Sequence, residues 1–308
     1  MTILGAFIVA VAAWLMPFFA DAPVVHLLLP AREEPLNATV LFAGDMMFDR
    51  TIRAAMAEKG SDHVFSCIAP ELRDADLVVA NLEGPVTTHD SMSLGSEIGS
   101  LENMTFTFPT TTAHLLARYN IRVVSLANNH IMNFGDDGLM QTKRWLAEAG
   151  VQYFGAPDDV DRTARVDIKG IPFSFIGWSD WDSTTKDETL AQIRTERALG
   201  RIVVVFAHWG EEYEPPPERV RALGRHFVDA GATLVVGAHP HIVQEHEVYN
   251  GTYIFYSLGN FVFDQYWNED VRTGLLVRAT FNKYGVTAID SLPIELGRDR
   301  RTCLKEIE

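Results

Sequence analysis

Short runs of Val, Ile, Leu and Phe recur along this chain from Ala38 onward, and amphipathic stretches separate several of them. Runs of this length and composition predict β-strands. The predicted strands cover residues 38–43, 77–80, 122–127, 172–177, 201–207, 233–237, 253–257, 274–281 and 286–290. Because strands alternate with helices, the pattern indicates an α/β protein with a largely parallel central sheet.

Two helices have clear boundaries in the sequence. Residues 136–149 begin with a pair of Asp residues and end at Gly150, and residues 218–230 end at Gly231. Acidic residues favour the first turn of a helix, and glycine is common just after its last residue. Both segments are therefore predicted as helices.

The last quarter of the chain and two other segments have a different character. From Tyr253 onward strands predominate, so we expect a second or mixed sheet there. Residues 88–109 are rich in Ser, Gly and Thr, and residues 211–218 are acidic and proline-rich. Both segments predict long loops, which often cover functional sites. A plain solvated insertion explains the first loop equally well.

The first twenty residues carry no charged side chain and are almost long enough to cross a bilayer. We interpret residues 1–21 as a signal peptide or membrane anchor and 22–37 as a tether. The alternative is a buried N-terminal helix. The remaining chain is predicted as one domain, 38–297, followed by a tail, 298–308. A targeting segment places that domain outside the cytoplasm, either membrane-anchored or secreted.

The charge balance and the cysteines restrict the possible functions. The net charge is −15, which argues against nucleic acid as a partner because such binding needs a basic face. A polyanionic partner would need a local basic patch. The two cysteines, Cys67 and Cys303, lie far apart in the chain. They predict neither a disulfide framework nor a cysteine-based zinc site.

Residue types that bind metals or transfer protons follow six of the apolar runs. These strand ends are Asp45, Asn81-Leu82-Glu83, Asn128-Asn129-His130, His208, His239-Pro240-His241 and Gly259-Asn260. In open α/β sheets, ligands bind outside the carboxyl ends of the strands. If these strands are parallel neighbours, we expect their ends to meet in one crevice.

Each strand end also has an ordinary structural explanation. Asp45 could be a turn or helix-cap residue, and His208 could be a hydrogen-bonded core histidine. His239 and His241 are the strongest single signal, because a two-residue spacing in extended chain places both imidazoles on one side. The same kind of residue follows six separate strands, and six unrelated structural explanations would all have to hold at once. The combined pattern therefore favours a metal site.

The mixture of donors indicates the kind of metal and the chemistry. Imidazole with carboxylate and amide oxygen, and without thiolate, suits Mn, Fe, Co or Zn better than Ca. More than four such residues point to two ions, so we expect one or two divalent ions. Paired ions activate water for hydrolysis.

Six segments resemble, in order and spacing, the CapA family of capsule (poly-gamma-glutamate) synthesis proteins. They are GDMMFDR (44–50), NLEGPVT (81–87), NNHIMNFGDDGL (128–139), HWGEEYEPPPERV (208–220), GAHPHIVQ (237–244) and YSLGNFVFD (256–264). That family is similar to the calcineurin-like metallophosphoesterases. The resemblance implies a four-layer sandwich of two mixed β-sheets flanked by helices.

The resemblance also implies roles for particular residues. The implied first-metal ligands are Asp45 and His241, the second-metal ligands are Asn129, His208 and His239, and Glu83 bridges both. His130 is the implied general acid. Substrate contacts are expected at Arg50, Glu212, Tyr213 and Asn260. One departure concerns the first ion: phosphoesterases carry an imidazole where this chain has Met47.

Three functions remain open at this point. The first is a CapA-like protein of capsule or poly-gamma-glutamate synthesis with a metal-dependent hydrolase site. The second is a non-catalytic export or anchoring subunit that works with membrane synthase subunits. The third is a general metal-dependent phosphoesterase. The corresponding substrates are an anionic polymer or a phosphate ester.

An aromatic pair near residue 180 also has two explanations. Trp178 and Trp181 could form a wall of a binding cleft, but core packing is the simpler expectation for both. The sequence contains no phosphate-binding P-loop, dinucleotide-binding glycine motif, serine nucleophile elbow or zincin motif. Nucleotide motors, dehydrogenases, serine hydrolases and zincin proteases are therefore not expected.

Overall fold

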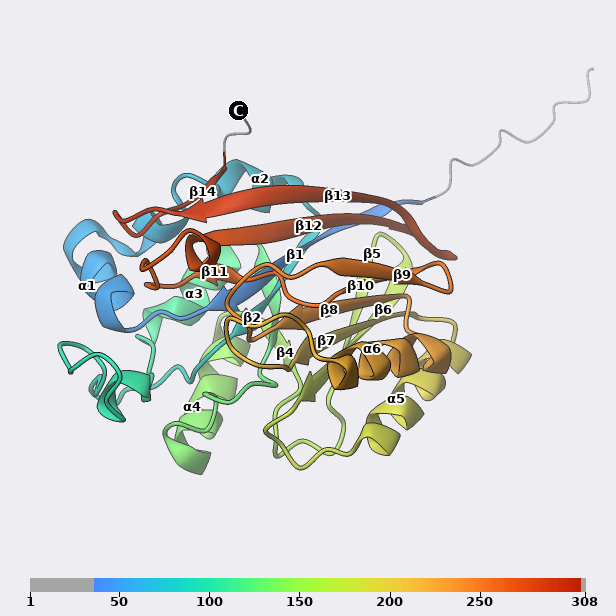
Figure 1. Cartoon of the computed structure of the whole chain (residues 1–308), viewed down its shortest axis with the longest axis horizontal. Helices are drawn as coiled ribbons and strands as arrows, with labels where there is room; N and C mark the ends of the chain where they lie inside the picture. The colour runs from blue at the N-terminus through green and yellow to red at the C-terminus, as the bar shows by residue number, and fades with distance from the viewer. Residues whose placement is uncertain (1–35, 306–308) are drawn as a thin grey trace, which may run out of the picture. The chain divides into compact units, whose positions relative to one another are not determined.

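The computed structural model describes residues 36–305, which contain two mixed β-sheets with helices on their outer faces (Figure 1). The strands are β1 (Ala38–Met46), β2 (Leu77–Leu82), β3 (Ile121–Ser125), β4 (Gln152–Phe154), β5 (Thr163–Ile168), β6 (Ile171–Ser179), β7 (Ile202–His208), β8 (Leu234–Ala238), β9 (His246–Tyr249), β10 (Thr252–Phe255), β11 (Asn260–Val262), β12 (Thr273–Asn282), β13 (Gly285–Leu296) and β14 (Thr302–Leu304). The helices are α1 (Arg50–Lys59), α2 (Ala69–Asp74), α3 (Thr111–Arg118), α4 (Gly135–Glu148), α5 (Lys186–Ala198) and α6 (Glu218–Ala230), with short 3₁₀ helices η1 (Ser61–Phe65), η2 (Glu102–Met104) and η3 (Asp270–Arg272).

Each sheet has a run of parallel strands, which antiparallel strands extend on one side in the first sheet and on both sides in the second. The first sheet has the order β14-β13-β12-β1-β2-β3-β4, and β11 pairs with the carboxyl end of β1. Strands β1 to β4 are parallel, whereas β12, β13 and β14 are antiparallel. The second sheet has the order β5-β6-β7-β8-β10-β9, in which β6, β7, β8 and β10 are parallel. The central strands of each sheet therefore have their carboxyl ends on the same side of that sheet, where the strands end.

The alternation of side chains along the central strands explains the layers. In β1, Val40 and Phe42 enter the core between the sheets, while Leu41 packs in the core under the helices. In β7, Val204 likewise enters the core between the sheets, and Val203 packs on the other face. Because both faces of these strands are buried, their sequences are apolar throughout rather than alternating.

The helices cover the outer face of each sheet. Residues of α1, α2, α3 and α4 belong to the core of the first sheet, and residues of α5 and α6 to that of the second. The order of layers is helix, sheet, sheet, helix. This confirms the predicted four-layer arrangement of two mixed sheets flanked by helices.

All nine predicted strands and both predicted helices are present. Five strands were not predicted: β4, β5, β9, β11 and β14. Four of them, β4, β9, β11 and β14, have only three or four residues, and β5 and β9 carry exposed polar residues that weaken the apolar signal. The strand-rich last quarter contributes β11, β12, β13 and β14 to the first sheet and β10 to the second.

The ends of the predicted domain need one correction. Residues 298–308 were predicted as a tail, but Thr302–Leu304 form β14, which pairs with β13. The predicted signal peptide or anchor (1–21) and most of the tether (22–37) lie outside the described residues. Within residues 36–305, no helix is long and apolar enough to cross a membrane.

A disulfide joins Cys303 in β14 to Cys67, which lies between η1 and α2. The two cysteines are 236 positions apart, so only the folded chain brings them together. No disulfide framework is expected from two cysteines so far apart, and the sequence does not predict this bond. It fastens the last strand to the helical layer of the first sheet.

Breaking this disulfide is expected to destabilise the protein. Cys67→Ser and Cys303→Ser should each lower the free energy of unfolding by about 2–4 kcal/mol, because the bond restricts the unfolded chain. The double variant should lose no more than either single variant, since all three lack the same bond. Denaturant unfolding under oxidising conditions measures these values. Equal stability of wild type and single variants would show that the bond contributes nothing.

Candidate metal centre

Asp45 lies at the carboxyl end of β1 and is fully buried. Its Oδ1 accepts a hydrogen bond from the Asn81 side chain (2.7 Å), and its Oδ2 accepts one from the His239 backbone N–H (3.0 Å). Burial raises the pKa of Asp45 to about 6. The preceding residue must be glycine, because a Cβ at Gly44 would lie 1.8 Å from the Gly259 carbonyl oxygen.

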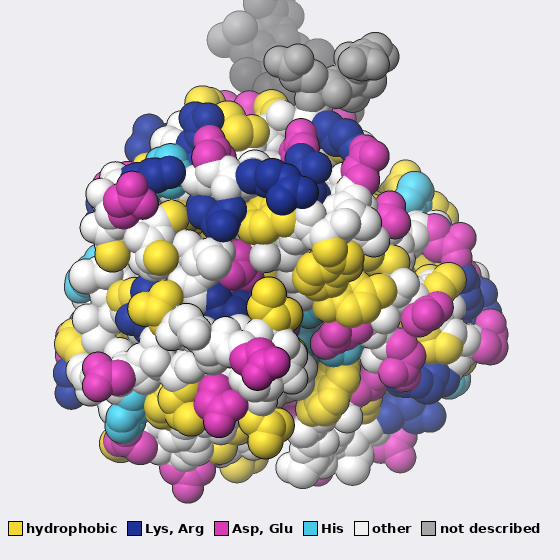
Figure 2. Space-filling view, turned by 60° about the vertical axis from the view of Figure 1, so that its left-hand side comes forward, with side chains coloured by type: hydrophobic (Ala, Val, Ile, Leu, Met, Phe, Trp, Pro, Cys, Tyr) yellow, Lys and Arg dark blue, Asp and Glu magenta, His cyan; other side chains and the backbone are white. Residues whose placement is uncertain are grey.

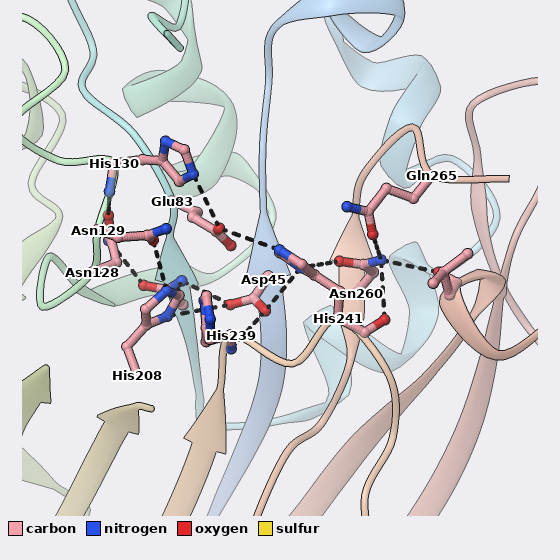
Figure 3. Close-up of polar contacts among 12 residues, drawn as sticks. Asp45, Glu83, Asn128, Asn129, His130, His208, His239, His241, Asn260 and Gln265 are labelled. Carbon is pink, nitrogen blue, oxygen red and sulfur yellow. Dashed lines mark hydrogen bonds and ion pairs between the residues drawn. The ribbon is translucent and has the colours of Figure 1, made fainter. Parts of the chain in front are cut away.

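Glu83 follows β2 and is also fully buried. Its Oε1 lies 3.6 Å from His241 Nε2 and 4.0 Å from His130 Nε2 (Figure 3). Neither oxygen accepts a hydrogen bond from the described residues. Burial, followed by the charge of Asp45, raises the pKa of Glu83 well above its usual value. Buried polar atoms without partners are rare and need an explanation such as a bound ion.

His208, the last residue of β7, lies close to residues at three other strand ends. Its Nε2 lies 2.9 Å from Asn129 Oδ1, and its Nδ1 lies 3.3 Å from the Asn81 amide nitrogen. The same ring nitrogen is 3.9 Å from Asp45 Oδ1. The second sheet thus delivers His208 to the oxygens that the first sheet provides.

His239 and His241 lie in the turn after β8. Both residues have positive φ, 98° and 58°, which is uncommon for residues other than glycine. Their ring centroids are 5.9 Å apart, and His239 Nδ1 has no hydrogen-bond partner among the described residues. Extended chain was the expected reason for their shared orientation. The reason is instead a turn that directs both rings into the same space (Figure 3).

Asn260, which is predicted to contact substrate, has its side-chain polar atoms bonded within the protein. It is fully buried, and β11 places it beside Asp45. Its Oδ1 lies 3.0 Å from His241 Nδ1, and its amide nitrogen donates to Gln265 Oε1 and to the Val271 carbonyl oxygen. Because its polar atoms are occupied, Asn260 positions the His241 ring.

The four imidazoles of the site are held in the neutral form. Burial lowers the pKa of His130 and of His239 to about 4. Burial and the other imidazoles lower the pKa values of His208 and His241 well below the usual value. A metal ion binds the neutral ring, so these histidines are in the form that binds metal near neutral pH.

The residues present fit a divalent cation. One ligand atom each from Asp45, Glu83 and His241 lie within 4.8 Å of one another, and so do atoms from Glu212, His239 and His241. The unpartnered oxygens of Glu83 and the unpartnered nitrogen of His239 are the atoms that a cation would use. The donors are oxygen and nitrogen, because both cysteines are in the disulfide.

His130 occupies the side of Glu83 away from His208. Its ring lies against Phe106, with centroids 4.3 Å apart, and its Nδ1 is 3.1 Å from Asn133 Oδ1. The Asn133 oxygen can only accept a hydrogen bond, so Nδ1 carries the proton and Nε2 faces Glu83. Asn133 was not predicted as a site residue.

Arg50 lies beside the centre at the start of α1. Its guanidinium packs between the rings of Phe106 and Phe263, 5.1 and 5.4 Å from their centroids, and pairs with Asp264 at 2.6 Å. Arg50 and Asp264 line a cavity of about 430 Å³, together with Ser93, Asn103 and Trp267 among others. The substrate contact predicted for Arg50 stays a prediction.

The remaining predicted substrate contacts lie on the 211–218 loop. Tyr213 accepts a hydrogen bond from the Gln265 side chain (3.0 Å), and its ring lies 6.0 Å from that of His241. Glu212 is half-buried beside His239 and His241. Both residues therefore border the centre.

Two further residues, Trp181 and Asn81, belong to the site. Trp181 was expected in the core, but it is 47% exposed and its ring lies 4.2 Å from that of His239. Trp178 packs in the core against Phe227, as expected. Asn81 links Asp45 to His208, a role that its place at a strand end could have indicated.

Figure 2 shows histidine (cyan) between hydrophobic and acidic side chains near the middle of one face.

The two mixed sheets and the gathered strand ends define a protein of the metallophosphoesterase-like fold. A phosphatase from Mycoplasma pneumoniae has a similar structure, with a TM-score of 0.54 over 85% of this chain and 95% of that one. The two sequences are 11% identical, so this similarity concerns the fold alone.

Residues 39–265 match the family described as bacterial capsule synthesis protein PGA_cap. The chain is 31% identical to a capsule biosynthesis protein CapA of Bacillus anthracis, over 94% of this chain and 74% of that protein. It is 32% identical to a PGA biosynthesis protein CapA of Bacillus subtilis, over 83% of this chain and 70% of that protein. The chain belongs to the PGA_cap family of bacterial capsule synthesis proteins, which confirms the resemblance noted in the sequence.

Proposed function

We propose that this protein acts in the synthesis of an anionic capsular polymer through a metal-dependent hydrolytic centre. One observation carries the proposal: the buried Glu83 carboxylate, which has no hydrogen-bond partner within residues 36–305, lies among neutral imidazoles delivered by both sheets. Family membership supports the polymer, since the Bacillus subtilis relative is named for PGA biosynthesis.

The proposed ligands form two groups that share Glu83. Asp45 and His241 hold the first ion, and Asn129, His208 and His239 hold the second. Mn, Fe, Co or Zn suits this mixture of nitrogen and oxygen donors. When bound, such ions supply an activated water molecule and neutralise negative charge on the reacting group.

His130 is the proposed general acid. Its Nδ1–H donates to Asn133, which fixes the ring with Nε2 toward the centre. The pKa of about 4 means that the ring is neutral in the free protein. A negatively charged substrate against Nε2 favours the protonated form. The ring then holds a proton at Nε2, within reach of a leaving group.

Basic residues near the cavity support an anionic substrate. Arg50 lines the cavity, and Arg300 donates from Nε to Thr51 Oγ1 (2.9 Å) at its margin. Arg298 and Arg301 flank Arg300 in the sequence, and Arg298 is exposed. Lys and Arg side chains (dark blue) are also frequent on the upper part of the face in Figure 2. Arg50 and Arg301 are paired with Asp264 and Asp299. Arg298 and Arg300 form no ion pair among the described residues, so they supply the local positive charge that an overall acidic protein needs for an anionic polymer.

We place the domain outside the cytoplasm. The Cys67–Cys303 disulfide supports this location, because disulfides persist in oxidising compartments and are rare in the cytosol. The uncharged first twenty residues support it independently.

A non-catalytic polymer-handling subunit is the second candidate. Met47 favours it, because this buried thioether accepts a hydrogen bond from the Asp49 backbone N–H (3.0 Å) and replaces an imidazole at the first ion. A centre with fewer ligands at one ion suits binding better than turnover. Such a subunit would work with synthase subunits in the membrane.

Complementation in a host whose polymer production depends on this chain separates the two candidates. We expect Asp45→Asn to abolish surface polymer as completely as deletion does, because it removes a first-ion ligand. Asp290→Asn, at an exposed position on β13, is the matched control and should restore wild-type amounts. Full polymer production and attachment by Asp45→Asn would instead establish the non-catalytic role.

A further inference from the structure

We propose that Glu212 is a direct ligand of the metal centre, rather than a substrate contact, and that it binds a cation on the side of the centre formed by His239 and His241. This inference rests on the proposed function, because it assumes that the centre binds a divalent cation. It adds a carboxylate from the 211–218 loop to donors that otherwise come from strand ends and the turn after β8.

The position of the Glu212 carboxylate carries the inference. One of its oxygens and one nitrogen each of His239 and His241 lie within 4.8 Å of one another. His239 is 4% exposed, and its Nδ1 has no hydrogen-bond partner among residues 36–305. A buried nitrogen without a partner, beside a carboxylate and a second imidazole, is a donor set that needs a cation.

The backbone around Glu212 is fixed against the histidine turn. On one side, the Gly210 N–H donates to Asp180 Oδ2 (3.1 Å). On the other, the Tyr213 N–H donates to the Pro240 carbonyl oxygen (2.9 Å), between the two histidines. Tyr213 has a φ of 63°, so the chain turns sharply there. Glu212 is thus held in place before any ligand arrives, as an effective metal ligand should be.

Glu212 also lacks the basic partner that its neighbour has. Glu211 is paired with Arg219 at 3.1 Å on the surface. No Lys or Arg among the described residues forms an ion pair with Glu212, which lies beside His239 and His241 instead. Its negative charge also raises the pKa of Asp45 and of Glu83, so three carboxylates are close enough to repel one another. Neutral imidazoles cannot balance that charge, whereas divalent ions can.

His241 connects Glu212 with the other carboxylates of the centre. It belongs to both clusters, with Asp45 and Glu83 on one side and with Glu212 and His239 on the other. A cation held by Glu212 would therefore lie next to the group formed by Asp45 and Glu83.

Metal binding by the full chain, purified in detergent, tests this inference. Titration calorimetry with Mn²⁺ gives stoichiometry and affinity, and electron paramagnetic resonance distinguishes a coupled Mn²⁺ pair from isolated ions. The variants are Glu212→Gln, Glu212→Ala and the matched control Glu211→Gln. We expect both Glu212 variants to lose one equivalent of Mn²⁺ or to bind it about 100-fold more weakly. Losing a residue that hydrogen-bonds to a metal ligand costs ~10–100-fold in metal affinity, so losing a ligand itself should cost at least the upper end of that range. The spectrum of the pair should disappear, and Glu211→Gln should behave as wild type.

The outcomes distinguish this inference from the proposed function. Wild-type stoichiometry, affinity and spectrum in both Glu212 variants would overturn the inference and leave the metal centre standing. If a Glu212 variant binds Mn²⁺ as the wild type does but has a changed KM for a phosphate ester, the inference is also overturned, and Glu212 is then a substrate contact. No Mn²⁺, Zn²⁺, Fe²⁺ or Co²⁺ binding by the wild type would overturn the proposed function itself. Thermal unfolding of the metal-free variants confirms that they are folded.

Discussion

Glu83→Gln is expected to weaken Mn²⁺ binding by about 100-fold or more. Removing a residue that only hydrogen-bonds to a metal ligand already lowers metal affinity by about 10–100-fold, and Glu83 is a proposed ligand. The same change should stabilise the metal-free protein. Glu83 is fully buried, and its two oxygens have no partners among the described residues. Glutamine cannot ionise, so the variant avoids the cost of placing a negative charge in this buried pocket, and its free energy of unfolding should be higher by on the order of 1 kcal/mol.

The stabilisation should depend on pH in a defined direction. Burial and Asp45 raise the pKa of Glu83 in the folded protein well above its value of 4.5. Above pH 4.5 the folded state therefore holds more protons than the unfolded state, and stability falls as the pH rises. Glutamine does not titrate, so the advantage of the variant should grow as the pH rises from 4.5.

Denaturant unfolding of the metal-free protein at several pH values measures this effect, and calorimetry measures metal affinity. Glu58→Gln, an exposed position on α1, is the control and should change neither quantity. Tight Mn²⁺ binding by Glu83→Gln would remove Glu83 from the ligand group. Equal or lower metal-free stability would show that the carboxylate is satisfied in the folded protein.

The opposite changes in stability and metal affinity follow from how the centre is built. Strands buried on both faces end together at the edge of the sheets, and polar residues placed there are necessarily desolvated. The fold gives up stability at Asp45 and Glu83 to form the pocket. Protein folded without metal is therefore expected to gain stability when a cation binds.

The sequence was most informative where burial is complete. The runs at β1 and β7 are apolar throughout because both faces are covered, so their ends could be located to within a few residues. Polar residues directly after such runs, including Asp45 and His208, stand out against the apolar background. For that reason, the strand-end residues could be chosen before the structure was known.

The remaining features depend on contacts between distant parts of the chain. The partner of Cys67, the pairing of β14 and the burial of Asn260 all require knowledge of which segments are neighbours. The turn at His239 and His241 adopts positive φ, which no residue type there indicates. Trp181 was assigned to the core by composition alone, although the strand before it ends two residues earlier at the site.

His130→Ala is expected to lower turnover by about 10²–10⁴-fold, the usual contribution of a general acid, while metal content stays unchanged. His130 is the only imidazole of the four at the site that is not a proposed ligand, and its Nε2 is 4.0 Å from Glu83 Oε1. Its ring is held by Phe106 and Asn133. Loss of the ring thus removes a proton donor without removing a ligand.

Leaving-group dependence provides the decisive measurement. A phosphate ester with an alkyl leaving group needs protonation, whereas a nitrophenyl ester leaves readily as the anion. If His130 donates the proton, the loss in His130→Ala should be large for the alkyl ester and small for the nitrophenyl ester. Asn133→Ala, which frees the ring, should show the same pattern more weakly. Equal losses on both esters, or loss of metal from His130→Ala, would assign His130 to the metal or to the fold rather than to proton transfer.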